Sequence, residues 1–99
     1  MHIIFHVTTG VEWKRAQEQG FYETPSLKTE GFIHCSEEHQ VDGVLERYFN
    51  GQSGLVKLVI DINKLTSRYV QEWSPSTKDT FPHIYGPINL DAVVEVVAL

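Results

Sequence analysis

The second half of the chain contains four stretches with strand character, joined by connections too short for helices. The stretches are residues 55–61 (LVKLVID), 68–73 (RYVQEW), 81–85 (FPHIY) and 93–99 (VVEVVAL). A crossover between parallel strands needs about a dozen residues or more, usually as a helix. The connections at 62–67, 74–80 and 86–92 leave no room for such a helix. These strands are therefore expected to pair antiparallel.

The first half alternates strands and helices. Residues 1–8 (MHIIFHVT) alternate in polarity and predict a strand with one apolar face. Thr9 and Glu12 then form the pattern of a capping box, which starts a helix. Gly20 is expected to end that helix in the left-handed conformation.

A second strand and helix follow. Residues 32–36 predict the strand, and Ser36 is the expected N-cap of the next helix. That helix has an apolar stripe at helical spacing, formed by Val41, Val44, Leu45 and Tyr48. Helices in the first half and strands in the second predict an α+β protein, in which a mostly antiparallel sheet curls over two helices.

Length and composition set further limits. The 99 residues predict a single domain spanning 1–99, and the 41% hydrophobic share is enough for one core. Net charge is −5, with 13 acidic against 8 basic residues, so a DNA-binding surface is not expected. A local basic pocket stays open, because four cations gather in the second half: Lys57, Lys64, Arg68 and Lys78.

Cysteine usage and hydropathy predict the compartment. A single cysteine excludes an intramolecular disulfide and fits a reducing environment. The chain shows no signal-peptide pattern and no apolar run of about 18 residues. The sequence therefore predicts a cytoplasmic protein without a membrane partner.

Two of the strands each carry a histidine and a second polar side chain two residues further on. Side chains alternate faces along a strand, so His34 and Ser36 share one face, as do His83 and Tyr85. Two histidine-bearing strands with the same spacing are the strongest indication of a site in this sequence.

Each of these residues also has a structural alternative. His34 can be a core histidine bonded to a backbone carbonyl, and Ser36 can act only as a helix cap. His83 can simply help to form the turn that precedes the Gly-Pro pair. Glu72 can be a solvated strand carboxylate paired with Arg68.

Cysteine and metal chemistry are disfavoured. Cys35 and His34 are adjacent in a strand and point apart, so the histidine cannot serve the thiol as a base. Cys35 is expected to be buried with Ile33. His34 and His39 lie close in the sequence, but no cysteine pair and no His-Glu-x-x-His run exists, so no metal site is predicted.

Five segments together resemble a known family. They are W..A...G.Y from Trp13, SL..EGFIHCS..HQ from Ser26, LVKLVID, an isolated Glu72, and FPHIYGPI. The set spans nearly the whole chain and resembles the small bacterial family catalogued as domain of unknown function 952. The resemblance implies a fold similar to the ADP-ribosyltransferase and RNA 2′-phosphotransferase group, with a split, curved sheet and a cleft for a nicotinamide dinucleotide.

In that wider group, polar residues from three strands line the cleft. The matching positions here are His6 with Thr8, His34 with Ser36, and Glu72 or His83. The resemblance thus implies NAD as the ligand. Together with the strand spacing, it predicts one pocket with Glu72 at its rim: catalytic Glu72, His34 and His83, and ligand-binding His6, Thr8, Ser36 and Tyr85.

The implied chemistry gives these residues specific tasks. Cleavage of NAD⁺ passes through an oxocarbenium-like centre, which a nearby carboxylate stabilises. Glu72 is assigned that task, and Tyr85 or Trp73 would stack on a ring of the ligand. Val70 stands where a paired acid commonly precedes this glutamate, so transfer to an arginine is not expected.

Two classes of function remain open. One is a transferase acting on a dinucleotide or another phosphate-bearing ligand through this cleft. The other is a non-catalytic nucleotide-binding or protein-interaction module on the same fold. Catalytic turnover that is lost when Glu72 is substituted would indicate the transferase and not the binding module.

Overall fold

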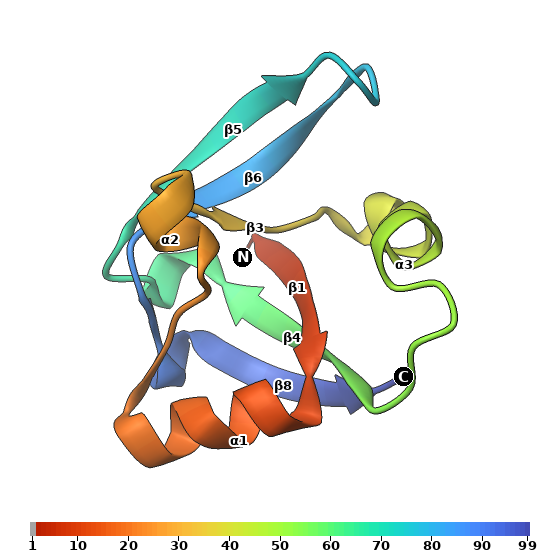
Figure 1. Cartoon of the computed structure of the whole chain (residues 1–99). Helices are drawn as coiled ribbons and strands as arrows, with labels where there is room; N and C mark the ends of the chain where they lie inside the picture. The colour runs from red at the N-terminus through yellow and green to blue at the C-terminus, as the bar shows by residue number, and fades with distance from the viewer. Residues whose placement is uncertain (1) are drawn as a thin grey trace.

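The computed structural model describes residues 2–99, whose strands form three small antiparallel sheets (Figure 1). The first sheet has the order β1–β4–β8, formed by Ile3–Thr9, Leu55–Asp61 and Val93–Ala98. The second pairs β2 (Phe21–Tyr22) with β7 (Ile88–Asn89). The third has the order β3–β6–β5, formed by Ile33–His34, Asp79–Tyr85 and Arg68–Ser74. The α+β prediction with antiparallel pairing is confirmed.

Three α-helices accompany the sheets in the described part of the chain. They are α1 (Gly10–Gln19), the single-turn α2 (Ser26–Thr29) and α3 (Val41–Tyr48). Short 3₁₀ turns cover Glu38–Gln40, Ile62–Lys64 and Leu90–Ala92. No helix within residues 2–99 is long and apolar enough to cross a membrane.

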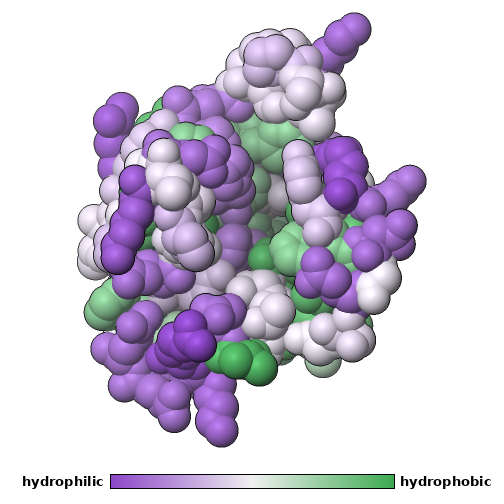
Figure 2. All heavy atoms as spheres, viewed as in Figure 1, coloured by the Kyte–Doolittle hydropathy of each residue, from purple (hydrophilic) through white to green (hydrophobic). Residues whose placement is uncertain are grey.

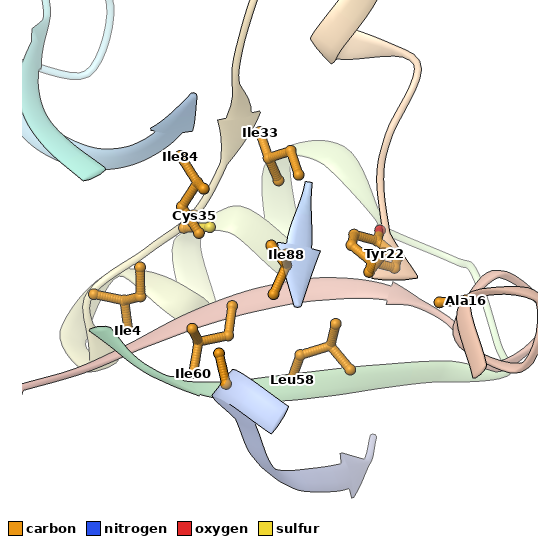
Figure 3. Close-up of a cluster of buried hydrophobic side chains, with 10 residues drawn as sticks. Ile4, Ala16, Tyr22, Ile33, Cys35, Leu58, Ile60, Ile84 and Ile88 are labelled. Carbon is orange, nitrogen blue, oxygen red and sulfur yellow. The ribbon is translucent and has the colours of Figure 1, made fainter. Parts of the chain in front are cut away.

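In the first sheet, β1 and β4 have buried side chains on both faces, whereas most of β8 is exposed. On one face, Ile4 and Leu58 belong to the main core, which also takes in Ala16 of α1 (Figure 3). On the other face, Phe5 packs in a smaller cluster with Val41 of α3. The sequence predicted one apolar face for the first strand, but in the structure both faces of β1 carry buried apolar side chains.

The termini of α1 follow the prediction in part: Thr9 and Gly20 bound the helix as expected, but the Glu12 side chain does not complete the predicted capping box. The Thr9 side chain accepts a hydrogen bond from the Glu12 amide at 3.1 Å. Gly20 ends the helix with φ of 97°, a conformation that glycine adopts without the steric cost of a Cβ atom. The Glu12 carboxylate lies 3.2 Å from Arg15.

The predicted cap of the next helix is wrong. Ser36 exchanges backbone hydrogen bonds with Phe5 of β1, at 2.7 and 2.8 Å. The cap is Glu37, which forms a reciprocal capping box with Gln40. A 3₁₀ turn follows, and α3 begins at Val41. The strand backbone thus continues through Ser36, and the helix starts only after it.

Gln40 connects the beginning of α3 to the hairpin of β5 and β6. Its side chain is 6% exposed and accepts from the Glu37 amide at 2.8 Å. Its amide nitrogen donates to Asp79 Oδ2 at 2.9 Å and to the Thr80 carbonyl at 2.7 Å. This buried carboxamide holds the tip of the hairpin at a set distance from the helix.

We expect Gln40→Ala to lower the free energy of unfolding by about 2 kcal/mol or more, because it leaves buried groups without partners. Gln17→Ala, on the exposed face of α1, is the control and should change stability by less than about 0.5 kcal/mol. Denaturant unfolding measures both. Equal effects of the two substitutions would contradict a connecting role for Gln40.

Candidate functional site

A pocket of about 570 Å³ lies between α3, the segment around β3 and the tip of the β5–β6 hairpin. Figure 2, in the same view as Figure 1, shows hydrophobic atoms in the hollow between the hairpin and α3. The strand residues on its wall include His6, His34, Ser36 and His83. The helix and hairpin contribute mainly aromatic and small polar side chains: Tyr48, Phe49, Trp73, Ser74, Ser76, Thr77 and Phe81.

The two predicted histidine strands come together. β3 and β6 pair with His34 directly opposite His83, and the ring centroids are 5.3 Å apart. Phe32 stacks on the His83 ring at 4.0 Å with an interplanar angle of 16°. It also contacts the His34 ring at 4.8 Å. The equal spacing in the two strands therefore places both histidines on one face, at the pocket wall.

Glu72 and Tyr85 are not on the pocket wall, but Glu72 contacts both His83 and Tyr85. Glu72 Oε1 accepts a hydrogen bond from His83 Nδ1 at 2.7 Å and another from the Tyr85 hydroxyl. Both bonds lower the pKa of the Glu72 carboxyl, and the bond from Tyr85 has the larger effect. The bond to Glu72 also raises the pKa of Tyr85.

The hydrogen bond to Glu72 determines which atom of His83 is available. A carboxylate only accepts, so Nδ1 carries the proton, and neutral His83 keeps a free electron pair on Nε2. The side chain is 13% exposed. A histidine oriented in this way by a carboxylate is suited to accept a proton from a bound ligand.

His34 has a different environment. Its Nε2 lies 3.0 Å from Glu30 Oε2, and both side chains are about half exposed. A surface pair of this kind is weak, so His34 is able to exchange Glu30 for a ligand. Ser36 is buried and lies beside it on the pocket wall.

His6 reaches the pocket wall, but both of its ring nitrogens bond to protein atoms. Nδ1 lies 2.6 Å from the His34 carbonyl and must donate to it, since a carbonyl only accepts. Nε2 therefore accepts from the Tyr22 hydroxyl at 2.8 Å. Burial lowers the pKa of His6 to about 4, so the ring is neutral. Thr8, predicted beside it, is buried and is not part of the wall.

Arg47 is the permanently charged residue on the wall, and no sequence motif points to it. None of the four cations proposed for a basic pocket lines it. The neighbour of Arg47, Tyr48, which completes the predicted apolar stripe of α3, also lines the pocket and is 64% exposed. Trp73, predicted to stack on a ligand, is on the wall, whereas Tyr85 is not.

Cys35 is buried as predicted, in the main core with Ile33. Burial raises the pKa of its thiol well above the usual range. Within residues 2–99, no three histidine, cysteine, aspartate or glutamate side chains come together as a metal site.

His6 should make stability depend on pH. The unfolded chain protonates this histidine near pH 6.5, whereas the folded protein resists protonation until about pH 4. The contribution of neutral His6 to the free energy of unfolding is therefore fully present above pH 6.5. It falls by roughly 2–3 kcal/mol as the pH drops toward 4. We expect the loss to be absent in His6→Gln, measured by denaturant unfolding across this range. Parallel pH curves for the two proteins would contradict the assignment.

Alkylation of native Cys35 at neutral pH should be slow, because both burial and the raised pKa suppress the thiolate. Labelling in denaturant should be fast and serves as the control. Fast labelling of the native protein would show that the thiol is accessible.

Protein CC0527 from Caulobacter crescentus has a similar structure. Its crystal structure matches with a TM-score of 0.87 and 29% identity, covering 97% of this chain and 84% of that chain. Its solution NMR structure matches with a TM-score of 0.79 and 29% identity, covering 100% and 85%. No curated protein matches. The family described as Protein of unknown function (DUF952) matches residues 7–96, and the chain therefore belongs to this family.

Proposed function

We propose that the pocket is the active site of a transferase that acts on a phosphate-bearing, nucleotide-like ligand. The observation that carries this proposal is His83, held by Glu72 through Nδ1, on the wall of a 570 Å³ pocket opposite His34. Pockets that bind small molecules usually have volumes of about 300–1,000 Å³ and few, well-placed polar groups. Perturbed titratable groups beside such a pocket are typical of active sites.

A nicotinamide dinucleotide is the ligand that the resemblance to the ADP-ribosyltransferase group implies. The divided antiparallel sheets support this fold relationship, since that group has a split sheet. In the proposed step, the bond between the nicotinamide nitrogen and ribose C1′ breaks, and its electron pair leaves with nicotinamide. The oxygen of an acceptor hydroxyl or water then bonds to C1′, and its proton passes to Nε2 of His83.

The role of Glu72 differs from the one expected from sequence. Its carboxylate bonds to His83 and Tyr85 and does not face the pocket. Glu72 is therefore a positioning residue, which orients the imidazole and stabilises its protonated form. His34 and Ser36 would supply hydrogen-bond donors to the ligand, while His6 supports the His34 backbone.

A non-catalytic nucleotide-binding module is the second candidate. One observation favours it: no aspartate or glutamate of residues 2–99 lines the large pocket. An oxocarbenium-like centre there would have no carboxylate directly beside it. On this reading the pocket binds its ligand without turnover.

The test measures binding and turnover separately. At about 100 times its dissociation constant, NAD⁺ should add roughly 2.7 kcal/mol of stability. For a chain of this size that shift raises Tm by about 10 °C or more. Nicotinamide release should fall by about 10²-fold or more in His83→Gln, the loss of a general base.

Glu72→Gln should reduce kcat and move the pH–rate profile, because the charge that stabilises protonated His83 is lost. Glu95→Gln, on the exposed side of β8, is the matched control and should leave both readouts unchanged. A thermal shift without nicotinamide release would support the binding module. Absence of a shift with NAD⁺, ADP-ribose and AMP up to millimolar concentration would contradict both candidates.

A further inference from the structure

We propose that Arg47 and Thr77 form a phosphate subsite on one side of this pocket. The inference rests on the proposed ligand class and gives it a definite recognition element: nucleoside phosphates bind, and nucleosides without phosphate bind weakly. Arg47 is in the last turn of α3, and Thr77 is in the turn that connects β5 and β6.

The charges around the pocket favour an anion. The protein carries a net charge of −5, yet no carboxylate of the described residues lines the large pocket. Arg47 does line it, and within residues 2–99 its guanidinium has no ion pair or side-chain hydrogen bond. A guanidinium presents a planar set of donors that matches a phosphate group.

Gly43 provides the space in which the guanidinium lies. A Cβ atom built on Gly43 would be 2.9 Å from Arg47 Nη1, closer than side chains normally approach. A glycine inside a helix costs about 1 kcal/mol relative to alanine. The atoms that approach Gly43 belong to the flexible end of Arg47, so a side chain at position 43 would displace the guanidinium from its place beside the helix.

Thr77 supplies a second polar group at the same place. Its hydroxyl oxygen is buried and has no hydrogen-bond partner within the described residues. A buried hydroxyl without a partner is unfavourable by about 1–3 kcal/mol. Because this oxygen is enclosed, the turn that carries Thr77 has to shift before a phosphate oxygen beside Arg47 can accept the hydrogen bond that Thr77 lacks.

Two pockets meet at this subsite. Arg47, Thr77 and Phe81 line both the large pocket and a smaller one of about 170 Å³. The smaller pocket contains the Asp79 carboxylate, which accepts a hydrogen bond from Gln40 and lies 3.8 Å from His39. Because this carboxylate repels an anion, the phosphate is expected on the side of the large pocket. The histidines of β3 and β6 then remain available to another part of an extended ligand.

The experiment compares adenosine, AMP and ADP-ribose by isothermal titration. In the wild-type protein, AMP and ADP-ribose should bind at least about tenfold tighter than adenosine, as one charge-assisted hydrogen bond predicts. Arg47→Met should remove this difference and leave adenosine binding unchanged. Arg15→Met, on α1 and paired with Glu12, removes the same charge elsewhere and is the control.

Gly43→Ala tests the geometry without removing a charge. Alanine favours the helix, so the variant should be at least as stable as the wild type, yet bind AMP several-fold more weakly because Arg47 is displaced. Equal affinities for adenosine and AMP in the wild type, or an AMP affinity unaffected by Arg47→Met, would overturn the subsite. Phosphate-dependent binding without nicotinamide release would retain the subsite and reject the transferase.

Discussion

The backbone of residues 33–36 is hydrogen-bonded on both sides, and the arrangement of the site depends on it. Toward the third sheet, Ile33 and His34 pair with β6, and the Cys35 amide donates to the Pro82 carbonyl at 3.0 Å. Toward the first sheet, Ser36 exchanges two backbone hydrogen bonds with Phe5. One short segment thus connects two sheets, which places a pair of histidines from β3 and β6 over the edge of β1.

The hydrogen-bond partners of the histidines then divide their roles. His6 is held neutral between a backbone carbonyl and the Tyr22 hydroxyl, so it supports the fold from within the wall. His83 is bonded to Glu72 through Nδ1 and stacked on Phe32, so Nε2 is the ring nitrogen that Glu72 does not bind. His34 has an exposed partner in Glu30 that a ligand can replace. Three similar side chains therefore differ in which ring nitrogens are already bonded, because their neighbours differ.

Much of the fold and part of the site could be predicted from residue patterns. That His34 and Ser36, and likewise His83 and Tyr85, share a face was predicted from period-two alternation, and the antiparallel hairpin of β5 and β6 was predicted from its short connection. The pairing of β3 with β6 was not predicted, because the two strands are far apart in the sequence. The cap assigned to Ser36 was wrong because a serine before acidic residues looks the same whether its backbone continues a strand or starts a helix. Glu72 was recognised as unusual, but its bond to His83 arises from strand register, which sequence does not state.

Local features of the chain were determined by the sequence itself: the strand patterns, Thr9 and Gly20 at the ends of α1, and the buried Cys35 opposite the histidine face. These depend on the properties of a few consecutive residues. The pocket was determined only by the tertiary structure. Its wall is formed by α3 and by a hairpin far along the chain, and Gln40 connects the two. The same holds for Arg47, whose helix position is unremarkable until the hairpin carrying Thr77 lies beside it. Contacts between distant segments have no local signature, so only the folded chain shows them.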